Sequence, residues 1–182
     1  MIIILETQRL VLRRFTLDDT PLIVHLLNEP LFLHFIGDKN VRTAEDAALY
    51  LQRGPLASYA QHGFGLYHVS LKGEGTPIGM CGLLKRDTLE DVDVGFAYLP
   101  QFGGRGYATE AAQATLQYGR TVLGLKRIVA ITAPDNTASI NVLTKIGLRH
   151  THTMQMPGHQ AASLLFTPVE LERRAGSTGR RS

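Results

Sequence analysis

Gln101-Phe102-Gly103-Gly104-Arg105-Gly106 is a glycine-rich turn in the middle of the chain. Residues 91–99 before it predict a strand, which Pro100 ends. Residues 106–123 after it predict a helix, whose many alanines allow close packing against a sheet and whose C-terminal cap is expected at Gly124. The turn is therefore a strand-to-helix junction, and the other elements are placed relative to it.

This junction has the chemistry of an anion site. The first N–H groups of a helix have no partner within it and carry the positive end of the helix dipole. A phosphate binds such groups directly, and glycine removes the Cβ atoms that would hold the phosphate at a distance. The spacing excludes a P-loop, and a turn after a mid-chain strand argues against a dinucleotide fold. The three glycines alone are equally compatible with a tight turn that binds nothing.

The flanking sequence predicts a mixed α/β domain over residues 1–170, followed by a disordered basic tail over 171–182. Residues 31–42 are expected to be irregular, and Gly54-Pro55 is expected to break or kink the helix that precedes it. The periodicity and turn residues predict these elements in order: a strand at 5–15, a helix from Thr16 to about 29, a helix from Thr43, strands at 64–71 and 77–84, the strand and helix around the glycine turn, a strand at 126–133, a helix ending at Gly147, and strands at 148–156 and 162–169.

Composition narrows the class of protein. The 182 residues fit one domain, and the net charge of +3 comes partly from arginines at the chain end, which argues against a nucleic-acid binder. The single cysteine, Cys81, excludes an intrachain disulfide, and no Cys/His cluster has zinc spacing, so no metal is expected. No secretory signal and no apolar run of about 20 residues is present. We expect a cytoplasmic monomer or homodimer that does not bind membranes.

The turn and two later strings resemble the GCN5-related N-acetyltransferases (GNAT). The acetyl-CoA loop of that family has the pattern Gln/Arg-x-x-Gly-x-Gly/Ala, which residues 101–106 match at every fixed position. The branch that contains the ribosomal-protein N-terminal acetyltransferases (RimJ/RimL-like) is similar over the wider stretch 99–111 and over three further strings: Glu6-Thr7-Gln8-Arg9-Leu10-Val11-Leu12-Arg13, Asn136-Thr137-Ala138-Ser139 and Lys145-Ile146-Gly147-Leu148. The resemblance covers about residues 5–168. It implies a twisted, mostly antiparallel sheet of about seven strands with about four helices.

The resemblance also implies where acetyl-CoA binds. In this family the strand before the loop splays from its neighbour, and the pantetheine arm pairs with the exposed backbone, here that of Phe96, Ala97 and Tyr98. The pyrophosphate would lie on the turn, formed by Phe102, Gly103, Gly104, Arg105, Gly106 and Tyr107. Asn136 is a favoured N-cap with Ser139 as its partner, and the resemblance adds contact with the pantetheine arm or the thiol.

Catalysis by direct attack of an amine on the thioester needs a base, an oxyanion donor and an acid. Family members often carry Glu as the base where this chain has Asp93, which is shorter and favours a water relay. That Asp93 is only a surface carboxylate is an equally good interpretation. The N–H of Phe96 is the expected oxyanion donor. The Tyr that many members use as acid is absent from the last helix, and Ser139 is the best substitute. Cys81, in an apolar strand, is expected to be structural and not an acetyl carrier.

The predicted function is transfer of acetyl from acetyl-CoA to an amine, in the first place a protein or peptide N-terminus. Acetylation of a small amine (an antibiotic or polyamine), an acetyl-CoA sensor without turnover, and an unrelated anion-binding domain are the alternatives. Acceptor choice is assigned to residues 28–45, the hairpin before the loop and residues 153–161. In these segments Phe32, His34 and Phe35 either form an aromatic wall of the acceptor site or pack against other helices. Acidic residues that would attract a polyamine are not concentrated in these segments.

Overall fold

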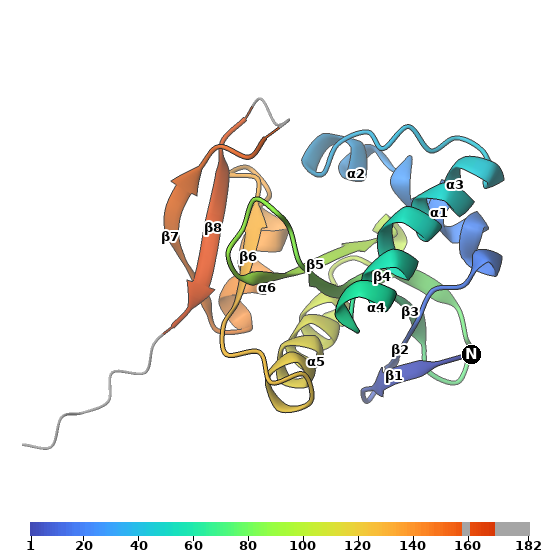
Figure 1. The fold of residues 1–182 in the computed structure, drawn as a ribbon, viewed down its shortest axis with the longest axis horizontal. Helices are drawn as coiled ribbons and strands as arrows, with labels where there is room; N and C mark the ends of the chain where they lie inside the picture. Colours follow the sequence, from blue (N-terminus) through green and yellow to red (C-terminus); the bar gives the residue numbers. More distant parts are fainter. Residues whose placement is uncertain (158–160, 170–182) are drawn as a thin grey trace, which may run out of the picture.

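A single sheet of eight strands organises the chain in the computed structural model, which describes residues 1–157 and 161–169 (Figure 1). The strand order is β1-β2-β3-β4-β5-β6-β8-β7. The bounds are β1 Ile3–Glu6, β2 Leu10–Arg13, β3 Leu66–Leu71, β4 Pro77–Leu84, β5 Val92–Tyr98, β6 Ile128–Thr132, β7 Leu148–Met154 and β8 Ser163–Pro168. The predicted tail at 171–182 and Gly158 of the last expected turn lie outside the described residues. The mixed α/β class is confirmed.

Helices α1 to α6 connect these strands: α1 Thr20–Leu27, α2 Pro30–Phe35, α3 Ala44–Leu51, α4 Ala57–His62, α5 Tyr107–Thr121 and α6 Thr137–Lys145. A π-helical turn, Gln52–Leu56, joins α3 to α4 and contains Pro55. Proline cannot donate the backbone hydrogen bond of a regular helix, which explains the irregular turn. The expected irregularity at Gly54-Pro55 is therefore confirmed. Among the described residues, no helix is both long and apolar enough to cross a membrane.

Two expected elements differ from those observed. The single strand predicted over residues 5–15 is a hairpin of β1 and β2, because the Thr7 side chain accepts from the Leu10 N–H (3.0 Å) while the Thr7 N–H donates to the Leu10 carbonyl (2.9 Å). This hairpin raises the strand count to eight. Residues 30–35, most of which were expected to be irregular, form α2, with Pro30 in the first turn, where its missing N–H costs nothing.

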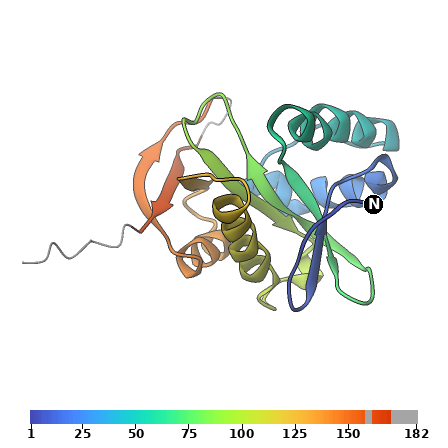
Figure 2. The same cartoon turned by 60° about the horizontal axis from the view of Figure 1, so that its bottom comes forward.

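The two faces of the sheet carry separate cores. The alternation of β4 places Cys81 in a cluster with α5 and Met80 in a cluster with α1 and α3. Ala111 and Ala112 of α5 are fully buried, so this helix packs closely on the sheet as its alanines predict. Figures 1 and 2 show α5 on one side of the strands and α1 and α2 on the other, whereas Tyr59 of α4 packs in the cluster that contains α5. The site lies where these layers meet at the end of β5.

The centre of the sheet is split beside β5. Antiparallel pairing of β5 with β4 runs from Asp93 to Tyr98. The parallel pairing of β5 with β6 covers only Val92↔Ile128 and Asp93↔Val129. Every other neighbouring pair in the sheet is antiparallel. Residues 94–98 of β5 therefore run past their parallel partner, which is the splay that the family resemblance implies.

Candidate active site

The glycine turn is separated from the end of β5 by two residues, and α5 begins at Tyr107, directly after the turn. Gly104 and Gly106 have φ angles of +70° and +82°, a left-handed conformation that glycine adopts without strain. The Glu110 N–H donates to the Gly106 carbonyl (3.0 Å) as the first bond of the helix. The N–H groups of residues 107–109 precede that bond, so they remain for a ligand.

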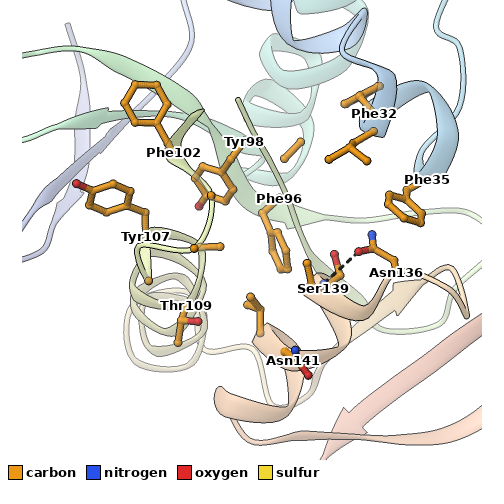
Figure 3. Close-up of a pocket in the computed structure, with 18 of the residues that line it drawn as sticks. Phe32, Phe35, Phe96, Tyr98, Phe102, Tyr107, Thr109, Asn136, Ser139 and Asn141 are labelled. Atoms are coloured by element: carbon orange, nitrogen blue, oxygen red, sulfur yellow. Dashed lines mark hydrogen bonds between the residues drawn. The ribbon is translucent and has the colours of Figure 1, made fainter. Parts of the chain in front are cut away.

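A cavity of about 440 Å³ lies against this turn (Figure 3). Its volume is in the range of small-molecule sites. The predicted cofactor residues on its wall are Phe96, Ala97, Tyr98, Phe102, Gly103, Gly104, Gly106, Tyr107, Asn136 and Ser139. Arg105 is the exception: its side chain is exposed and its carbonyl accepts from Arg9 Nη1 (2.9 Å). We call this space the donor cavity.

The backbone of β5 faces the donor cavity at alternate residues. The Leu99 N–H donates to the Ile78 carbonyl (2.9 Å), so the backbone groups of residues 95, 97 and 99 point to β4. Those of Phe96 and Tyr98 then point to the side on which pairing with β6 has ended. The Phe96 N–H is thus in position to donate to a ligand, as an oxyanion donor must.

Helix α6 forms the opposite wall. The Asn136 side chain accepts from the Ser139 N–H (3.1 Å), which confirms the predicted N-cap and leaves the Ser139 hydroxyl to the cavity. Asn141 and Lys145 also line the donor cavity and were missed in the sequence. Their spacing from residue 138, three and seven positions, places them on the cavity face of α6 and was the signal for finding them.

A second cavity of about 310 Å³ lies on the other side of Phe96 and Ser139. We call it the acceptor cavity. The residues that line both cavities are Phe32, Phe35, Ile36, Phe96, Asn136 and Ser139. The two spaces therefore meet at these six residues, between α2, β5 and the start of α6. Figure 3 shows Phe96 and Ser139 facing this junction, with Phe35 above it on α2.

Asp93 lies in the acceptor cavity, which rules out the alternative of a surface carboxylate. Its side chain is 1% exposed, and one carboxylate oxygen accepts from Arg86 Nε at 2.9 Å. Burial raises the pKa of Asp93, and the Arg86 charge opposes that rise only in part. A raised pKa makes the ionised carboxylate a better proton acceptor than an ordinary Asp.

The expected aromatic acceptor residues divide in their roles. Phe32 and Phe35 line the acceptor cavity, and Phe32 also packs in the core beside α1, as the helix-packing alternative predicts. His34 points elsewhere: its Nε2 lies 3.0 Å from Asp135 Oδ2, which joins α2 to the turn before α6. The described residues of 153–161, expected to shape the acceptor site, line neither cavity.

Arg9 supports the glycine turn from the short turn between β1 and β2, and it was missed as a site residue. Its Nε donates to Glu110 Oε2 (2.7 Å), its Nη1 donates to the Arg105 carbonyl, and its guanidinium lies 4.5 Å from the Tyr107 ring centroid. Partial burial opposes ionisation of Glu110, but hydrogen bonds from Thr7 and Arg9 hold its pKa below the usual range. These contacts hold the C-terminal end of the turn against the start of α5. The sequence did offer a signal for Arg9, because this residue is part of the string at 6–13 that resembles the first strand of the family branch.

Cys81 is fully buried, as predicted, and its Sγ lies 3.5 Å from Thr115 Oγ1. Burial raises the pKa of the thiol to about 11. A thiol with this pKa is a poor nucleophile at neutral pH. Among the described residues, no group of three or more His, Cys, Asp or Glu is placed to hold a metal ion.

Residues 9–149 match the family described as the acetyltransferase (GNAT) domain. The chain belongs to the GNAT acetyltransferases. YnaD of Bacillus subtilis, an uncharacterized N-acetyltransferase, is 30% identical over 145 residues, which cover 80% of this chain and 82% of YnaD. A GNAT acetyltransferase structure from Bacillus anthracis is 27% identical, has a TM-score of 0.75, and covers 92% of this chain and 97% of its own.

The ribosomal L7/L12 α-N-protein acetyltransferase RimL, solved with coenzyme A, has a TM-score of 0.72 at 16% identity, covering 92% of this chain and 97% of its own. At this identity the likeness shows a common fold, as the branch resemblance predicts. The GNAT enzyme described here is an acetyl-CoA-dependent N-acetyltransferase, with acetyl-CoA as its cosubstrate. The donor cavity fits that molecule, because it joins a glycine turn suited to phosphates to the free backbone edge of β5.

Proposed function

We propose that this GNAT enzyme acetylates the α-amino group of a protein or peptide N-terminus by direct transfer. The observation that carries the proposal is the junction of the two cavities at Phe96 and Ser139, with Asp93 on the acceptor side. Acetyl-CoA enters along the glycine turn, and the amine enters from the acceptor cavity. The thioester and the amine then approach one another between β5 and α6.

The proposed reaction moves two protons. One leaves the ammonium group before the nitrogen attacks, and the other passes from the nitrogen to the thiolate after the attack. Asp93 accepts the first proton from the ammonium, directly or through a water, which frees the nitrogen lone pair. The nitrogen bonds to the thioester carbon, and the Phe96 N–H stabilises the oxyanion. The C–S bond then breaks. Ser139 passes the second proton from the nitrogen to the departing thiolate, which gives the acetylated amine and free coenzyme A.

Two features favour an α-amine as acceptor over a lysine side chain or a polyamine. An α-amino group has a pKa of about 7.7–8.0, against about 10.4 for lysine, so it loses its proton far more readily. Lys39 and Arg86 both line the acceptor cavity, so their charges repel a second cationic group.

The test measures release of coenzyme A thiol with acetyl-CoA and four acceptors: a peptide with a free N-terminus, the same peptide with a blocked N-terminus and an internal lysine, spermidine, and no amine. Mass spectrometry then locates the acetyl group. Thiol release with the free N-terminus alone is the expected result. Acetyl-CoA binding without release on any amine would support the sensor, and faster release with spermidine would support a polyamine acceptor.

A further inference from the structure

The acceptor cavity contains more positive than negative charge. Its charged lining residues are Lys39, Arg86 and Asp93, so two cations face one carboxylate. Partial burial lowers the pKa of Lys39, and so does the positive charge of Arg86, which lies near enough to act on it. Two cations held close together without a full counter-charge favour the binding of an anion between them.

Lys39 is free to provide that binding. It makes no hydrogen bond or ion pair with any residue that the structure describes. Its acidic neighbour, Asp38, is committed elsewhere, since it accepts two hydrogen bonds from the Arg42 guanidinium at 3.1 and 2.7 Å. Much of the Lys39 side chain is exposed, which leaves the ammonium able to move toward a ligand in the cavity.

Arg86 and Tyr50 add further donors on the same wall. Arg86 uses Nε for Asp93, and within the described part of the chain neither Nη atom has a hydrogen-bond partner. Those two nitrogens are the pair that binds a carboxylate in bidentate fashion. Burial raises the pKa of Tyr50 to about 12, so its hydroxyl keeps its proton at neutral pH and donates.

We propose that the amine acceptor of this enzyme carries a carboxylate, which binds to Arg86 Nη, Lys39 Nζ and the Tyr50 hydroxyl while the amine lies at Asp93. The inference rests on that part of the proposed function that makes an α-amino group the acceptor, and it names the class of acceptor. The carboxylate has two possible sources: the side chain of an acidic residue close to a peptide N-terminus, or the α-carboxylate of a free amino acid. Both present the same oxygens to the same donors.

The first test compares pairs of acceptors in which an amide replaces the carboxylate. Initial rates are measured with the peptide amides Ala-Glu-Ala and Ala-Gln-Ala, and with alanine and alaninamide as the free amino acid pair. We expect kcat/KM to be at least about tenfold higher for the carboxylate member of one pair, and the pair concerned identifies the source. Equal kcat/KM within both pairs overturns the proposal.

Charge reversal at Lys39 supplies the second test. Lys39→Glu should lower kcat/KM for the carboxylate acceptor by about tenfold or more, chiefly through KM, and should lower kcat/KM for the neutral acceptor much less. Lys126→Glu is the matched control, because Lys126 is exposed on the loop between α5 and β6 and lines neither cavity. The same loss in both variants, or none in Lys39→Glu, contradicts the assignment.

A binding measurement separates this inference from the reaction itself. The N-acetylated products of the two peptides and of alanine and alaninamide are titrated calorimetrically into the wild-type enzyme saturated with coenzyme A. Tighter binding of a carboxylate product, lost in Lys39→Glu, is expected even if turnover fails. Equal binding overturns the carboxylate site. Preferential binding without any acetyl transfer leaves the site standing and refutes the proposed function.

Discussion

Replacing Gly104 by Val separates the phosphate role of the glycine turn from its backbone role. Gly104 has a φ of +70°, and a Cβ built on it meets no atom within 4 Å. The cost to the free protein is therefore conformational and not steric, about 1–2 kcal/mol for a side chain in the left-handed region. Domains of this kind are stable by about 5–15 kcal/mol, so the variant should fold.

The same open space decides the effect on the cosubstrate. Gly104 lines the donor cavity, so a branched side chain at this position occupies the volume that a phosphate needs to reach the N–H groups of the turn. We expect the Kd for acetyl-CoA to rise at least about tenfold, which corresponds to about 1.4 kcal/mol. Calorimetry with acetyl-CoA measures the Kd, and thermal unfolding without ligand measures the stability cost.

Gly75→Val is the matched control for this experiment. Gly75 lies between β3 and β4 with a φ of +72°, its added Cβ also meets nothing within 4 Å, and it lines neither cavity. The two variants should lose similar stability, and only Gly104→Val should lose affinity. Equal affinity for acetyl-CoA in both folded variants would refute the phosphate site at the turn.

Three further substitutions test the chemistry. Asp93→Asn should lower kcat by about 10²–10⁴-fold with little change in acetyl-CoA affinity. Because burial raises the pKa of Asp93, the wild-type rate should rise with pH around a value above the ordinary pKa range of aspartate. If the variant keeps the same rise in rate with pH, Asp93 is not the base. Ser139→Ala keeps the N–H that donates to Asn136, so stability should hold while kcat falls, and an unchanged kcat would exclude the hydroxyl as proton carrier. Cys81→Ala should retain kcat within a few-fold, because the buried thiol has a pKa of about 11, whereas complete loss in a folded variant would indicate an acetyl-cysteine route.

Local features of the sequence predicted much of the donor side. The strand, turn and helix around Gly104 depend on neighbouring residues, as does the cap between Asn136 and Ser139. Glycines, caps and alanine-rich helices carry their conformational preferences within a few residues, so each was visible without the fold. The hairpin at β1 and β2 was missed because alternation continues across its short turn, and Thr7 closes the turn by hydrogen bonds that a periodicity argument does not weigh.

The sequence by itself determined the GNAT resemblance, the glycine turn, the position of Asp93 on its strand and the solitary buried cysteine. The tertiary structure alone decided that β5 separates from β6, that two cavities meet at Phe96 and Ser139, and that Lys39 and Arg86 share one wall. The physical reason is distance along the chain. Strand pairing, burial and the field of neighbouring charges depend on residues that only folding brings together, and they set the pKa of Asp93 and the charge of the acceptor cavity.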